Sequence, residues 1–272
     1  MGIKSIIAKI EMLPPLPESV RRLDEAFHSG DPAIDEIVSI VQTDPLLTAN
    51  ILAMANAPSS GIKNRIISVM QAITLFGHST VRGFALKAAM ERHFELDLTP
   101  YGIVNEDLSK ISMMQNALMF QWYMGVDIEK AKILIPLAFI METGKALIAR
   151  EAIEKGREED FLAAIREGKS EEEAELEFVG ATTAEVGALL FRHWNFDEMF
   201  VVLMEQLAQR GEDCERLSAM GMALKAVRSA VNISEQLSES SIEAGCQIVR
   251  EIGKDPERFA KVAQRVAAKF YE

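Results

Sequence analysis

Apolar residues recur every three or four positions along most of the chain, the spacing that gives an α-helix one buried face. Val20, Leu23 and Phe27 show this spacing near the N-terminus, and no stretch alternates apolar and polar residues over the length of a strand. Helix starts are marked as well. In Asp44-Pro45 the aspartate can accept the first free amides of a helix, and proline suits its first turn. The pattern therefore predicts an all-α protein.

The helices are expected to fall into two parts. Residues 1–100 should form about five short helices, and the segment 95–105, with Pro100 and Gly102, reads as a boundary. The predicted organisation is an N-terminal helical bundle over residues 1–100 packed on a second bundle over 101–272. Helices are expected in the second part over residues 106–124, 128–150, 158–167, 171–192, 196–209, 214–233, 239–252 and 256–270.

Three prolines between Leu13 and Pro17 interrupt the first part. Proline stops a helix and favours extended backbone around it, so the segment predicts an elbow. A polyproline ligand for a partner domain is the alternative. An internal elbow is the favoured interpretation.

One largely apolar segment, Ile133–Arg150, places Glu142 where a central buried helix should be driest. Pro136 is expected to kink this helix or to mark its first turn. Buried carboxylates are normally paired, so Lys145 or a hydrogen bond within the bundle is the expected partner of Glu142. The acidic run Glu171–Glu175 is instead interpreted as a solvated helix start, which the helix dipole favours.

Charge and composition narrow the function classes. The net charge is −12 and no local basic patch is present, which argues against DNA or RNA binding. The longest apolar run is too short to span a membrane, and the N-terminus lacks the apolar core of a signal peptide. Cys214 and Cys246 lack any ligand spacing and predict reduced thiols in a cytoplasmic protein. The oligomeric state stays open, a homodimer included.

Three segments carry a resemblance to a known family. They are LPPLPESV from Leu13, TDPLLTANILAMANAPSSG from Thr43, and ISVMQAITLFGHSTVRGFAL from Ile67. In this order they resemble the HDOD family, over Leu13 to about Gln209. The resemblance implies an N-terminal bundle packed on a degenerate bundle like that of the HD metal-dependent phosphohydrolases, and it implies a role in signal transduction.

The resemblance also shows which metal ligands have changed. HD enzymes carry a His-Asp pair late in an apolar helix, and Met141 and Glu142 look like that pair here. Thr183 stands where a later motif often begins with histidine, and the early histidine should fall near Ser112 or Met113. HD hydrolysis needs imidazole and carboxylate ligands for hard metals. None of these positions holds one of the four histidines, which are His28, His78, His93 and His193.

These observations predict a non-enzymatic regulatory module that binds a signalling protein or a small ligand, with no catalytic residue, metal or cofactor. Two candidate surfaces follow from the sequence. The HD-like cleft would use Met113, Met141, Glu142, Lys145 and Thr183, and the turn-rich loop at 56–61 would meet a partner through Asn56, Ser59 and Ser60.

Two alternatives stay open. A phosphohydrolase or phosphodiesterase with an atypical HD site would need Glu142, other acids of the second half and His193 to converge on a metal. A cyclic-nucleotide receptor that does not hydrolyse its ligand would need a basic residue in the cleft, and Lys145 and Arg192 are the nearest candidates.

Overall fold

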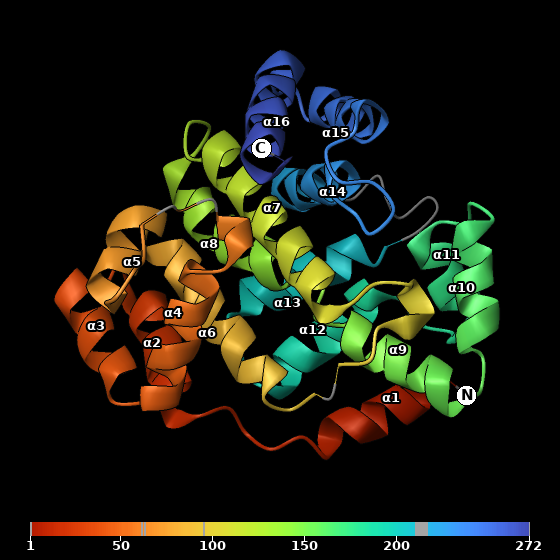
Figure 1. The fold of residues 1–272 in the computed structure, drawn as a ribbon, viewed down its shortest axis with the longest axis horizontal. Coiled ribbons are helices and arrows are strands. Elements are labelled where there is room, and N and C mark those ends of the chain that lie inside the picture. The colour runs from red at the N-terminus through yellow and green to blue at the C-terminus, as the bar shows by residue number, and fades with distance from the viewer. Residues whose placement is uncertain (1, 61, 63, 95, 210–216, 272) are drawn as a thin grey trace.

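The fold is all-α, as the hydrophobic pattern predicts (Figure 1). A computed structural model describes residues 2–60, 62, 64–94, 96–209 and 217–271. Among these residues there is no β-strand, and only an isolated antiparallel bridge joins Val231 to Gln236.

The described residues up to Tyr101 form six α-helices rather than about five, with two short 3-10 turns. Asp44 accepts hydrogen bonds from the amides of Leu46 and Leu47, at 3.0 and 2.9 Å, and so starts its helix as predicted. The elements are α1 (Gly2–Glu11), α2 (Glu18–Ser29), α3 (Ile34–Gln42), α4 (Pro45–Ala55), η1 (Pro58–Ser60), α5 (Val69–Phe76), α6 (His78–Glu91) and η2 (Thr99–Tyr101).

Two helices predicted in the second part are each divided in two. The helix expected over 128–150 breaks at the turn 141–144, whereas Pro136 lies inside the first piece and does not begin it. The helix expected over 171–192 breaks where Gly180 adopts φ +83° and Thr182 caps the next helix. The elements are α7 (Asn105–Tyr123), α8 (Ile128–Ile140), α9 (Lys145–Glu154), α10 (Glu158–Arg166), α11 (Glu171–Phe178), α12 (Thr183–His193), α13 (Glu198–Leu207), α14 (Ala219–Ala230), α15 (Glu239–Glu251) and α16 (Pro256–Tyr271).

A single apolar core runs through the whole helical assembly. Figure 1 shows α2 to α6 on one side, α7 and α8 through the middle, and α14 to α16 above them. α8 packs against both α6 and α7, so the core continues from the first hundred residues into the rest. α1 lies apart from α2 to α6 and packs against α9 and α12, where Lys9 pairs with Glu151 at 2.6 Å. The division at residue 100 stays a prediction.

The proline segment forms hydrogen bonds with the rest of the protein. The carbonyl of Leu13 accepts a hydrogen bond from Nε2 of His193, and that of Pro14 accepts one from the indole of Trp194, each at 3.1 Å. These bonds fasten the connection between α1 and α2 to the end of α12 and support the internal elbow over a partner ligand.

No single helix of the described residues is long and apolar enough to cross a membrane. Only α3 and α4 taken together reach that length and composition, and a bend of 119° separates them. Cys246 is a buried free thiol, and Cys214 lies outside the described residues.

Candidate functional site

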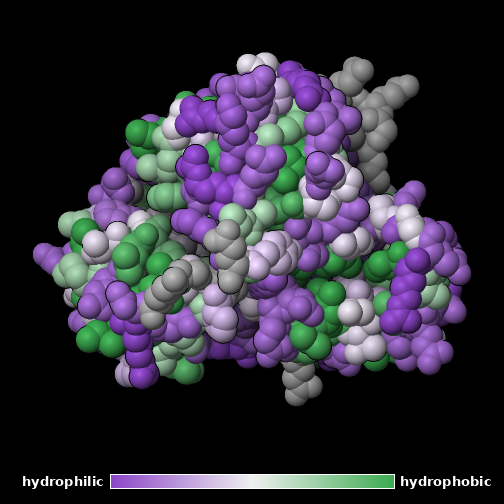
Figure 2. All heavy atoms as spheres, turned by 45° about the horizontal axis from the view of Figure 1, so that its top comes forward, coloured by the Kyte–Doolittle hydropathy of each residue, from purple (hydrophilic) through white to green (hydrophobic). Residues whose placement is uncertain are grey.

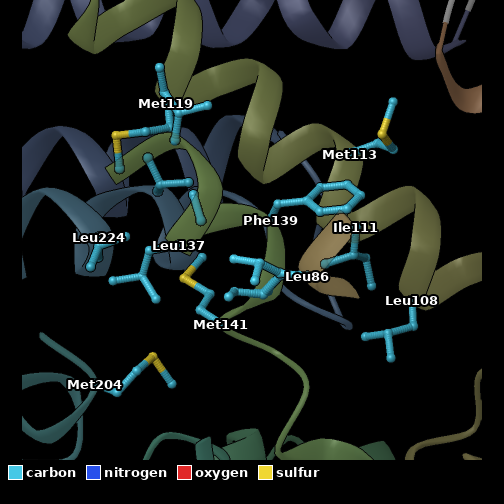
Figure 3. Packing of buried hydrophobic residues seen from close by; sticks show 14 of the residues in the cluster. Leu86, Leu108, Ile111, Met113, Met119, Leu137, Phe139, Met141, Met204 and Leu224 are labelled. Atoms are coloured by element: carbon cyan, nitrogen blue, oxygen red, sulfur yellow. The ribbon is translucent and has the colours of Figure 1, made fainter. Parts of the chain in front are cut away.

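The turn between α8 and α9 holds Met141 and Glu142, the residues expected at the position of the HD pair. Met141 and Glu142 are almost fully buried in it, and Figure 3 shows Met141 among apolar side chains that include Leu86 and Leu137. Gly144 closes the turn against α12, because a Cβ added there would meet the carbonyl oxygen of Thr183 at 2.2 Å. The missing side chain lets the two helix starts touch.

Glu142 is paired from three directions. One carboxylate oxygen accepts hydrogen bonds from Nε of Arg228 on α14, at 3.0 Å, and from Nε2 of Gln115 on α7, at 3.1 Å. The other lies 3.0 Å from the ammonium of Lys145. The sequence-based prediction that Lys145 or a bundle hydrogen bond would partner Glu142 is confirmed on both counts.

Lys145 lies at the centre of a buried charge network. Its side chain is 1% exposed, and its ammonium lies 3.0 Å from Glu142, 2.5 Å from Glu171 and 3.6 Å from Glu175. The ammonium also lies 5.0 Å from the centre of the Tyr101 ring. Three carboxylates therefore surround one cation.

Glu175 carries the network on to α12. Its carboxylate accepts hydrogen bonds from the amide and hydroxyl of Thr183, at 2.6 and 2.5 Å, and from the hydroxyl of Tyr101, at 2.8 Å. Glu171 accepts a hydrogen bond from the backbone amide of Ile233, which follows α14, at 2.8 Å. Each of the three carboxylates thus accepts a hydrogen bond from a neutral group and also lies near a cation, although Oε2 of Glu142 meets only the ammonium of Lys145.

The electrostatics keep Glu142 ionised. Burial alone raises the pKa of its carboxyl, but the charges of Arg228 and Lys145 outweigh burial and lower that pKa to about 2. The surrounding carboxylates outweigh burial at Lys145 too and raise its pKa. Both groups are charged at neutral pH, so the pair is a fixed salt bridge.

The structure brings four of the five predicted cleft residues together. Met141, Glu142, Lys145 and Thr183 meet at the network, but they are buried and do not line an open cleft. Met113 lies elsewhere on α7, against a smaller cavity. At the neighbouring position, the hydroxyl of Ser112 accepts a hydrogen bond from buried Lys87 at 2.9 Å.

Sequence reasoning missed most of the network. Arg228, Gln115 and Tyr101 lie far from Glu142 along the chain, and no local pattern points to them. The acidic run did contain a signal. Glu171 and Glu175 are four residues apart and so share one helix face, and that face turns inward. The interpretation of the run as solvated is wrong for these two residues.

The residues at this centre do not fit a catalytic metal. Met141 offers a soft thioether in an apolar setting, and the carboxylate of Glu142 is engaged by two cationic side chains and an amide. In the described part of the chain, no three His, Cys, Asp or Glu side chains come close enough to hold a metal ion. The network has the form of a structural cross-link.

The edge of the network lines a surface cavity. A cavity of about 540 Å³ is lined by Arg228 and Glu171, together with Lys225 and Asn232. Arg192, the other basic residue expected near the cleft, pairs with Glu205 on the surface instead.

The second predicted surface is a loop held from within. Asn56 donates to the carbonyls of Leu52 and Ile66, at 2.7 and 2.8 Å, and accepts the amide of Ile66 at 2.8 Å. Its amide group clamps the loop between α4 and α5. Ser60 is half-buried in η1, whereas the side chain of Ser59 and the whole of Gly61 lie outside what the structure describes.

Comparison with known proteins identifies a family and several structures with the same fold. The HDOD domain model matches residues 13–209, whereas a comparison with curated proteins found no match. The fold is shared with a virulence factor from Campylobacter jejuni, at 23% identity and a TM-score of 0.57, with 99% of each chain covered.

Two further solved structures are similar. One is a provisionally named phosphohydrolase from Shewanella amazonensis, at 19% identity and a TM-score of 0.66, with 97% of this chain and 94% of that one covered. The other is a provisionally named signal transduction protein from Marinobacter aquaeolei, at 15% identity and a TM-score of 0.69, with 98% of this chain and 62% of that one covered. The identities are low, so these likenesses show a shared fold. The family match spans most of the sequence, and the chain belongs to the HDOD family.

Proposed function

We propose that this protein is a signalling module that does not hydrolyse phosphoesters and acts by binding a protein partner or a small ligand. The observation that carries the proposal is the filled HD-like centre. Lys145 and Arg228 hold Glu142, and Met141 takes the place of the histidine, so the side chains that would bind a hard metal are replaced or already paired.

The family and the names of similar proteins bear on the kind of function. The signalling role rests on membership of the HDOD family and on the name of the Marinobacter aquaeolei relative. The name of the Shewanella amazonensis relative points to hydrolysis, but the fold is what this chain shares with it. A nucleotide receptor at the same centre is not favoured, because three carboxylates already neutralise Lys145 there.

Hydrolysis provides the direct test. The untagged protein should be dialysed, analysed for bound metal and assayed with bis(p-nitrophenyl) phosphate in added Mn²⁺. We expect no turnover above that of Glu142→Gln and of His193→Ala, which removes the only histidine of the second half. Turnover in the wild type that is lost in Glu142→Gln while that variant stays folded would overturn the proposal.

A partner surface is proposed at the loop between α4 and α5. Figure 2 shows apolar side chains gathered at the left of the molecule, over the N-terminal helices. Ile62 and Ile67 in this loop are 37% and 71% exposed, and apolar groups that stay exposed often mark protein contacts. The side chain of Asn56 binds the backbone of Ile66 across this loop, and the proposed partner contacts are Ser59 and Ser60.

Site-specific crosslinking tests this surface. A photoreactive benzoylphenylalanine replaces Ser59 in cells, and the matched control carries it at Arg150, which is exposed on α9. A discrete adduct formed from position 59 and absent from position 150 is the expected result. Equal adducts from both positions, or none from position 59, would remove the loop as the partner surface.

A further inference from the structure

A large cavity lies away from the HD-like network. It has a volume of about 890 Å³ and opens between α4, the end of α6, the start of α7 and the end of α16. Its apolar wall includes Ala53, Met54, Phe94 and Phe270. A concave site of this size, mostly apolar with a few polar groups, is typical of a small-ligand site.

Arg92 lines this cavity, and two of its hydrogen-bond donors are unpaired among the described residues. Its side chain is 21% exposed, and its Nη1 lies 3.5 Å from the carboxylate of Asp44. Its Nε and Nη2 are buried and donate to no acceptor of the described residues. Leaving buried guanidinium donors unpaired is costly, so these two groups favour an incoming anion.

The second cation on the wall is Lys110. Its ammonium lies 4.4 Å from the centre of the Tyr271 ring, and it forms no ion pair with the described residues. An ammonium group over an aromatic ring can still form an ion pair with an anion. Arg92 and Lys110 thus supply two incompletely neutralised positive charges to one cavity.

Two of the acids on the same wall have partners within the protein. Asp107 accepts the amide of Val104 at 3.0 Å, at the start of α7, and Glu91 lies 3.7 Å from the ammonium of buried Lys87. The third acid, Glu106, is exposed to solvent, as is Asp107, and water and salt screen exposed charges. Arg92 and Lys110 are half-buried, so an anion that enters the cavity would meet these two basic groups.

We propose that this cavity binds a small amphipathic anion, a carboxylate or a phosphate monoester with an apolar body. The anionic head would meet Arg92 and Lys110, and the body would lie against Met54, Phe94 and Phe270. The inference rests on the proposed binding role and names a ligand class for it. Its readout is binding rather than loss of turnover, so either proposal can fail without the other.

Titration calorimetry tests the site with three probes that share one chain length: decanoate, decyl phosphate and the neutral 1-decanol. We expect an anion to bind more tightly than the alcohol, and the better anion identifies the head group. Arg92→Gln and Lys110→Gln should each weaken anion binding at least tenfold. Arg150→Gln, which removes an exposed arginine of α9, is the matched control and should leave binding unchanged.

A second variant guards against loss of folding. Ala53→Trp introduces a large side chain from an exposed position on α4 and should block the cavity without disturbing the core. Anion binding should fall at least tenfold in this variant while the circular dichroism spectrum stays that of the wild type. Binding of equal strength to Ala53→Trp and Arg92→Gln, or no binding of either anion to the wild type, would overturn the proposal.

Discussion

The ammonium of Lys145 lies at the centre of a buried group of acids in the second half. It collects the carboxylates of Glu142, Glu171 and Glu175, which come from the turn before α9 and from α11. Removing one partner of a buried pair leaves uncompensated charge and is strongly destabilising. Through these ion pairs, the side chain of Lys145 holds the turn before α9 and helix α11 together.

Truncating this side chain gives the first prediction. Lys145→Ala should lower the free energy of unfolding by roughly 3–5 kcal/mol in urea denaturation, because Glu171 and Glu175 lose the ammonium beside them and Glu142 keeps only Arg228. The matched control is Lys130→Ala, whose exposed pair with Asp127 should matter much less.

The pKa of Glu142 predicts how stability depends on pH. Burial raises this pKa, but Arg228 and Lys145 lower it to about 2 from an ordinary value of 4.5. A lowered carboxyl pKa contributes stability above the unfolded-state value, and this contribution is lost as the pH falls from about 4.5 towards 2. The contribution is on the order of 3 kcal/mol, at about 1.4 kcal/mol for each pH unit.

Comparison with Glu142→Gln isolates this carboxyl from the other acids. The difference in unfolding free energy between the wild type and this variant should be constant above pH 5 and should shrink below pH 4.5. Denaturant titrations at a series of pH values measure it. A difference that stays constant down to pH 2 would contradict the ion pair.

At the scale of elements, contact between the starts of α9 and α12 depends on Gly144. Its backbone has φ −56°, which any residue can adopt, so only space restricts the position. Gly144→Ala would place a methyl group 2.2 Å from the carbonyl oxygen of Thr183, and the two helix starts would have to separate. That movement would also pull Thr183 away from Glu175.

Two glycine variants separate crowding from backbone strain. Gly156 has φ +64° with no atom within 4 Å of an added Cβ, so Gly156→Ala should cost only the roughly 1–2 kcal/mol of a left-handed alanine. Gly144→Ala should cost more than this in thermal or urea unfolding. If Gly144→Ala proves to be the milder variant, the close contact between α9 and α12 is not as described.

At the scale of the whole molecule, packing crosses the predicted boundary at residue 100. α6 lies against α8, and Arg82 of α6 is 3% exposed while it binds Asp24 of α2 at 2.6 Å and stacks on Phe200 of α13 at 4.8 Å. α1 packs on α9 and α12. Segments from both sides of the boundary thus share one core.

This arrangement predicts a single unfolding transition. Calorimetry of the full chain should give one peak whose calorimetric and van't Hoff enthalpies agree. Residues 101–272 expressed alone should be poorly soluble, because the apolar face that α8 turns to α6 would be exposed. Two separate transitions would instead support independent units divided near residue 100.

Much of the fold could be predicted from sequence because helix signals are local. The cap at Asp44 and the pairing of Glu142 with Lys145 three residues later involve neighbours along the chain. The divided helices were missed because hydrophobic spacing alone continues through both breaks. The break at 141–144 involves contact with α12 at Gly144, whereas the break in 171–192 carries local signals, the positive φ of Gly180 and the cap at Thr182.

The sequence by itself determined the helical class and the family, and it places no histidine where the resemblance expects metal ligands, because residue types and their spacing carry that information. Only the tertiary structure decided which side chains pair with Glu142. Arg228 lies 86 residues from Glu142, and Glu171 and Glu175 come from a run that reads as a solvated surface. A buried charge chooses partners by their distance in space, and folding alone brings them within reach.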